Sequence, residues 1–177
     1  MTSRELRQSR VVFPGPDLRA PTAFSLAVPD GWVLSEVPLA LVAIHPPEPV
    51  DGFWVHALVS TTRVAAEVDL RAVAASGLER LRREQPEADV RVERMGRFGD
   101  QPVHLRGLTL PTGSPPRPTS QLQALLRAPV TPGRAVTDLV TVVGSCPEAR
   151  SDEFVPRFID LVASIEFGLG DPPIPGA

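Results

Sequence analysis

The 177-residue sequence contains no lysine, asparagine or tyrosine, and Cys146 is its only cysteine. A single cysteine excludes a disulfide within the chain. One thiol and three histidines also argue against a zinc site with several such ligands. Acidic residues outnumber basic ones by 21 to 18, whereas domains that bind nucleic acid are usually basic. We therefore expect neither a metal or other cofactor nor a nucleic-acid partner.

Long apolar runs are also missing, and crossing a membrane as a helix takes about 20 such residues. The first ten residues carry positive charge like the start of a signal peptide, but Val11-Val12-Phe13 runs directly into Pro14. The apolar segment of a signal peptide therefore does not follow. We expect a cytoplasmic protein without membrane insertion, and the lone cysteine is compatible with a reducing compartment.

Proline is abundant, at 21 of 177 residues, and it interrupts both ends of the chain. We expect residues 1–20 to form an N-terminal arm and residues 169–177 to form a disordered tail. The intervening residues 21–168 are long enough for one domain with its own core.

Alternation of apolar and polar residues predicts strands, and three- or four-residue spacing predicts helices. The strands are expected at 24–28, 39–44, 53–62, 90–97, 103–110, 119–127 and 135–143. The helices are expected at 67–84 and from Ser151, whose hydroxyl should cap the second helix. Its expected buried stripe comprises Phe154, Phe158, Leu161, Val162 and Ile165. Hairpin-linked strands with two helices predict an α+β domain, an antiparallel sheet flanked by helices.

Two segments resemble the PsbP-like fold superfamily. The first is Phe24-Ser-Leu-Ala-Val-Pro-Asp-Gly-Trp32, an apolar strand followed by a P-x-G-W pattern. The second runs from Val142-Val143-Gly144 through Cys146 to Ser164-Ile165-Glu166-Phe167. The superfamily includes the photosystem PsbP proteins, the Ran-binding Mog protein, DcrB-type proteins and the actinobacterial lipoprotein LpqN. The resemblance covers about residues 22–167.

The resemblance implies an α/β/α sandwich and a protein that is not an enzyme. Members of the superfamily bind other proteins, and one secretion-associated branch chaperones apolar segments of effectors. The chain departs from the LpqN type in its missing lipoprotein signal, and from the group in its Pro-rich residues 111–118. No partner-binding residue is carried over from the family.

Strand 53–62 offers the clearest candidate surface. Alternation places Trp54, His56, Leu58 and Ser60 on one face and Phe53, Val55, Ala57 and Val59 on the other. Trp32 and Trp54 both suit a core. If the Trp54 face is the uncovered one, Trp54 and Leu58 would instead form an apolar patch for a partner.

His104 and Arg106 share a face of another strand and suggest an alternative. If they met His56 across the sheet, the three could line a pocket of an enzyme or a small-molecule-binding protein. A structural role is the simpler interpretation of each histidine, and His45, before two prolines, is expected in a loop. Sequence alone leaves both hypotheses open.

The remaining reactive groups favour structural interpretations. Cys146 follows a strand in a Gly-Ser-Cys-Pro turn, where a buried small residue is commoner than a nucleophile. No G-x-S-x-G, P-loop or G-x-G-x-x-G pattern occurs. Arg80, Arg82 and Arg83 alternate with acids on a solvated helix face, and residues 115–118 are more simply a turn than a polyproline ligand.

The leading hypothesis is a non-catalytic adaptor or chaperone that binds a protein partner on the open sheet face, and a homodimer is compatible with it. Its candidate residues are Trp54, His56, Leu58, His104 and Arg106.

Overall fold

The structure, a computed structural model, describes residues 20–168. Its strands are β1 (Phe24–Ser25), β2 (Val33–Ser35), β3 (Val42–His45), β4 (His56–Ala65), β5 (Asp89–Phe98), β6 (Gln101–Thr112), β7 (Arg117–Arg127), β8 (Val136–Pro147) and β9 (Glu166–Phe167). Its helices are α1 (Leu70–Glu84), α2 (Ser151–Ala163) and the 3₁₀ turn Glu148–Arg150. The expected arm and tail fall almost entirely outside the described residues.

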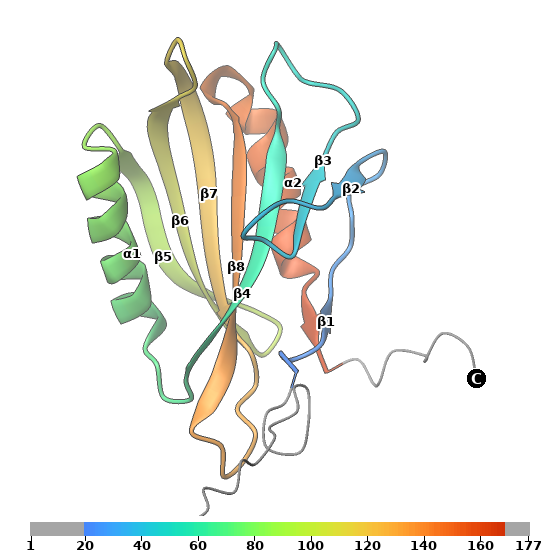
Figure 1. Ribbon diagram of the computed structural model, residues 1–177, viewed down its shortest axis with the longest axis vertical. Helices are drawn as coiled ribbons and strands as arrows, with labels where there is room; N and C mark the ends of the chain where they lie inside the picture. Colours follow the sequence, from blue (N-terminus) through green and yellow to red (C-terminus); the bar gives the residue numbers. More distant parts are fainter. Residues whose placement is uncertain (1–19, 169–177) are drawn as a thin grey trace, which may run out of the picture.

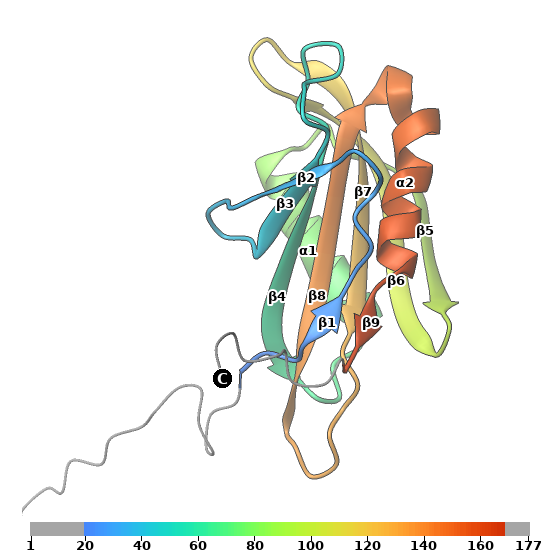
Figure 2. The ribbon, with the colours of Figure 1, turned by 90° about the vertical axis from the view of Figure 1, so that its right-hand side faces the viewer.

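Seven of the strands form one antiparallel sheet in the order β2-β3-β4-β8-β7-β6-β5 (Figure 1). β1 and β9 pair separately, with Phe24 opposite Phe167. The central neighbours β4, β8, β7 and β6 are in register over nine or ten residue pairs at each junction. The predicted α+β antiparallel class is therefore confirmed, with α1 and α2 on opposite faces of the sheet (Figures 1 and 2).

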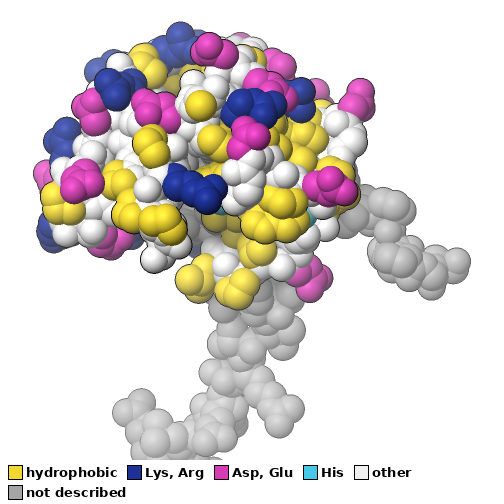
Figure 3. All heavy atoms as spheres, turned by 90° about the horizontal axis from the view of Figure 1, so that it is seen from above, with side chains coloured by type: hydrophobic (Ala, Val, Ile, Leu, Met, Phe, Trp, Pro, Cys, Tyr) yellow, Lys and Arg dark blue, Asp and Glu magenta, His cyan; other side chains and the backbone are white. Residues whose placement is uncertain are grey.

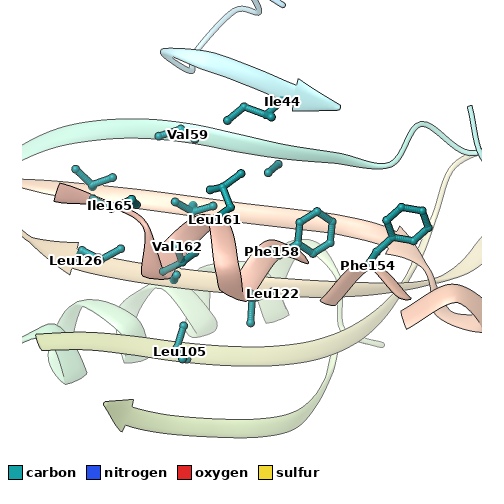
Figure 4. Packing of buried hydrophobic residues seen from close by; sticks show 14 of the residues in the cluster. Ile44, Val59, Leu105, Leu122, Leu126, Phe154, Phe158, Leu161, Val162 and Ile165 are labelled. Carbon is teal, nitrogen blue, oxygen red and sulfur yellow. The ribbon is translucent and has the colours of Figure 1, made fainter. Parts of the chain in front are cut away.

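The face under α2 holds the main core (Figure 4). Period-two alternation directs every second residue of the strands toward it, so Ala57 and Val59 of β4, and Val55 just before it, have no exposed surface. The expected stripe of α2 is buried against them. Trp32 packs edge-on to Phe158, with ring centroids 6.0 Å apart, so the prediction of Trp32 as a core residue is confirmed.

The opposite face is covered over only part of its width. α1 packs on β6 and β7, with Leu70 and Ala74 buried. Its first turn is capped by Asp69, whose carboxylate accepts the backbone N–H of Arg71 at 3.0 Å. β2, β3 and β4 lie beyond the reach of this helix (Figure 1).

Local backbone geometry overrides the sequence patterns at three places. Leu39 alternates like a strand residue but occupies a turn with φ of 65° and is fully exposed. Ser151 begins α2 and makes no capping hydrogen bond, because the preceding 3₁₀ turn already brings the chain into a helical course. β1 covers only Phe24–Ser25 of the strand expected at 24–28, since only these two residues pair with β9.

Candidate functional site

The part of the sheet that α1 leaves uncovered carries a continuous row of side chains across β2, β3 and β4. Ser35 of β2 lies opposite Ala43 of β3, and Ala43 lies opposite Leu58 of β4. Directly opposed residues of antiparallel strands share one face. This is the face away from α2, since the alternate β4 residues, such as Ala57, belong to the core.

An apolar hollow of about 340 Å³ lies over this row. We call it the Trp54 hollow; it is lined by Ser35, Val37, Ala43, His45, Trp54, His56 and Leu58. Trp54 keeps 54% of its surface exposed, which is unusual for so large an apolar side chain. Trp54 is thus not a core residue, and the structure brings Trp54, His56 and Leu58 together on the uncovered face.

His45 fixes one wall of the Trp54 hollow. Its Nδ1 lies 2.7 Å from the carbonyl oxygen of Pro46, which can only accept, so Nδ1 carries the proton. Nε2 then accepts the hydroxyl of Ser35 at 2.8 Å. Trp54 stands edge-on to this ring, with centroids 5.5 Å apart. Because both nitrogens of His45 are engaged, the ring is a rigid support for the indole.

His56, the first residue of β4, also lines the Trp54 hollow. Its Nδ1 donates to the carbonyl oxygen of Trp54 at 2.7 Å, and its ring stacks on Phe53 at 6.5 Å. Because a carbonyl oxygen can only accept a hydrogen bond, the proton of His56 is on Nδ1. Nε2 is then the nitrogen available to a ligand.

A second, more polar hollow of about 490 Å³ adjoins the first at Trp54 and His56. We call it the Arg117 hollow. Its floor follows the cross-strand row of His56, Ser145 and Gln121. Its other lining residues are Gly52, Phe53, Trp54, Thr112, Gly113, Ser114, Pro115, Arg117 and Thr119. In the view from above, hydrophobic side chains gather in the lower part of the described surface (Figure 3).

His104 and Arg106 lie elsewhere, buried between β6 and α1. Nε2 of His104 and Nη2 of Arg106 both donate to one carboxylate oxygen of Glu93, at 2.8 and 2.6 Å. Arg106 also donates to the carbonyl oxygen of Ala74 in α1, at 2.9 Å. This cluster anchors α1 to the sheet.

The structure does not bring His56 to His104 and Arg106. β8 and β7 separate β4 from β6, which places these residues at least about 14 Å apart across the sheet at ~4.8 Å per strand. A pocket using all three is therefore not formed. The sequence offered no register, and without the register a shared strand face cannot be distinguished from a shared site.

The cysteine and metal-ligand observations add no chemistry to the site. Burial, with a smaller contribution from Glu153, raises the pKa of the Cys146 thiol to about 11, so it stays a protonated core residue. Within residues 20–168, no three His, Cys, Asp or Glu side chains gather as metal ligands. None of the helices in this part of the chain is long and apolar enough to cross a membrane.

Sequence reasoning missed Ser35, His45 and Arg117. His45 closes strand β3 instead of lying in a loop, because it pairs with Val33 of β2. β2 is three residues long and its alternation is too brief to recognise. Arg117 stands in a Pro-rich stretch whose strand character becomes visible only in its pairing with Thr112.

No family model and no curated protein matches the sequence. Several solved structures match the fold. LpqN of Mycobacterium tuberculosis, described as involved in cell envelope biogenesis, has a TM-score of 0.67 and 13% identity, over 84% of this chain and 86% of that one. Cyanobacterial PsbP of Synechocystis sp. PCC 6803 gives 0.59 and 14%, over 82% and 86%.

The Ran-binding protein Mog1p of Saccharomyces cerevisiae gives a TM-score of 0.51 and 11% identity, over 81% of this chain and 89% of that one. At these identities the likeness shows the fold alone. This chain has the PsbP-like fold that the two sequence segments suggested.

Proposed function

We propose that the chain is a non-catalytic protein-binding module, an adaptor or chaperone, and that the Trp54 hollow is its binding surface. The observation that carries the proposal is a half-exposed tryptophan, held in place by His45, above an apolar hollow on a bare sheet face. Apolar hollows with an aromatic anchor are the usual centres of protein interfaces.

The free energy available at Trp54 suits such a role. Covering the exposed part of its indole would remove on the order of 100 Å² of apolar surface from water, worth about 2–3 kcal/mol at ~25 cal/mol per Å². Leu58 and Val37 extend the contact area beside it.

The fold supports a binding role in general terms. One solved structure with this fold is described as a Ran-binding protein, and another as involved in cell envelope biogenesis. The identity of a partner does not follow from such distant likeness. The cytoplasmic location and a homodimer both remain predictions, and LpqN belongs to an envelope process.

Capture from native lysate tests the proposal. The tagged full chain should retain a partner, identified by mass spectrometry, and the variant Trp54→Ala should lose it. Val136→Ala is the matched control, because Val136 is 46% exposed at the start of β8 and lines neither hollow. We expect both variants to melt close to the wild type, since both side chains are about half exposed and neither belongs to the buried core.

Equal capture by wild type and Trp54→Ala would contradict the proposed surface. An empty capture with every form would contradict a stable adaptor.

A further inference from the structure

We propose that the two adjoining hollows together take one extended protein segment, whose apolar side chain fills the Trp54 hollow and whose carboxylate meets Arg117. The inference rests on the proposed function and specifies the chemistry of the partner. It follows from the continuity of the hollows, their charge and the unmet donors of Arg117.

Because the two hollows adjoin each other, their combined length sets the length of the bound protein segment. The Trp54 hollow starts at Ser35 on β2, and the Arg117 hollow reaches Gln121 on β7. These strands are four steps apart in the sheet order, about 19 Å at ~4.8 Å per step. We call the two hollows together the trough. An extended chain advances ~3.3 Å per residue, so about six residues cross it.

Charge sets the composition. The chain is acidic overall, with 21 carboxylates and a net charge of -3, yet no acidic side chain lines either hollow. The ionisable groups there are His45, His56 and Arg117. Arg117 is the one charged side chain in this lining, and it is a cation, so the two hollows favour a partner segment that carries a carboxylate.

Arg117 is the group that a carboxylate would meet. It is exposed and donates one hydrogen bond, from Nη1 to the carbonyl oxygen of Asp51, at 3.2 Å. The carboxylate of Asp51 is bound instead by Arg150, at 3.1 Å. A guanidinium has five N–H donors, so Arg117 can still bind a carboxylate through a pair of them.

A peptide suits the trough better than a nucleic acid does. One arginine cannot neutralise a run of phosphates, which nucleic-acid grooves meet with several cations. The Trp54 hollow also has a mainly apolar lining without a cation, which suits an apolar side chain better than a backbone phosphate. Fluorescein-labelled single-stranded DNA serves as the test of this alternative.

Selection from a library of short random peptides, displayed on phage and panned on the full chain, tests the proposal. We expect the enriched peptides to carry an apolar residue followed or preceded within a few positions by Asp or Glu. A fluorescein-labelled consensus peptide should lose at least tenfold in affinity with Trp54→Ala and with Arg117→Glu. The control Arg134→Glu changes an exposed arginine in the β7–β8 turn and should leave the affinity unchanged.

Panning on Arg117→Glu should replace the acidic residue of the consensus by a basic one. Peptides that depend on Trp54 but show no acidic preference, and bind Arg117→Glu equally well, would overturn this inference and leave the binding surface standing. Peptides that bind independently of Trp54 would overturn both, as would tighter binding of the DNA than of any peptide.

Discussion

Replacing Gly144 with alanine should destabilise the protein by about 3 kcal/mol or more, at the upper end of what overpacking a core costs. A Cβ at this position of β8 would overlap Cγ of Phe158 in α2 and would lie 2.6 and 2.7 Å from two further ring carbons. Phe158 has no exposed surface and is held by Trp32, so the ring has no space into which to move. Urea unfolding followed by circular dichroism measures the loss.

Gly77→Ala is the matched control for this prediction. Gly77 lies in α1, and a Cβ there would meet no atom within 4 Å. Alanine should therefore stabilise the helix by about 0.5–1 kcal/mol, the usual difference in helix propensity. A Gly144→Ala protein as stable as the wild type would show that α2 does not sit this closely on β8.

Replacing Glu93 with glutamine should cost about 2–3 kcal/mol at pH 7, slightly less than breaking a fully buried ion pair, because Glu93 is partly exposed. The change leaves the guanidinium of Arg106, which is 2% exposed, without its counter-charge. Its Nε already lacks a hydrogen-bond partner, so the site has little further capacity to compensate. Chemical denaturation at constant pH gives the difference.

The same substitution should change how stability depends on pH. Desolvation opposes ionisation of Glu93, but hydrogen bonds from Arg106 and His104 outweigh it and hold the pKa of this carboxyl below its ordinary value of 4.5. A depressed pKa in the folded state gives stability that is complete above the unfolded-state pKa and is lost as pH falls through the folded-state pKa. Wild-type stability should therefore decline below about pH 4.5, and Glu93→Gln should lack this part of the decline.

The double variant Glu93→Gln with Arg106→Met distinguishes an uncompensated charge from simple loss of contact. Removing both partners should cost less than the sum of the two single changes. The ion-pair account would be contradicted if the losses of unfolding free energy in the two single variants simply added up in the double variant. It would also be contradicted if the stability of Glu93→Gln fell at low pH as much as that of the wild type.

Much of the fold could be predicted from periodicity. The face of α2 that carries Phe154 and Phe158 was evident from its spacing, and so was the division of β4 into a core face with Val59 and an outer face with Leu58. These patterns arise because burial enforces the period of each element. Short strands such as β2 and β9 were not predicted, since two or three residues are too few to show a period.

The candidate site was only half predictable, for a physical reason. Alternation shows which residues share a face of one strand, whereas contact across strands depends on strand order and register. Trp54 lies just before β4 and Leu58 lies within it, so the alternation of this one segment placed them on the same face. The pairing of β2, β3 and β4 places His45 beside them. The pairing of β5 with β6 places His104 beside Glu93, away from this site. Whether a face is bare depends on where α1 packs, which no local pattern encodes.

Photo-crosslinking in the native cell tests the central claim most directly. Benzoylphenylalanine, a large aromatic side chain that keeps an apolar anchor where alanine removes it, replaces Trp54 in one form. In two others it replaces exposed valines outside both hollows, Val92 on β5 and Val136 on β8. The account predicts a discrete adduct with a protein partner from position 54 and none from positions 92 and 136. An adduct from position 92 or 136 without one from position 54 would contradict it.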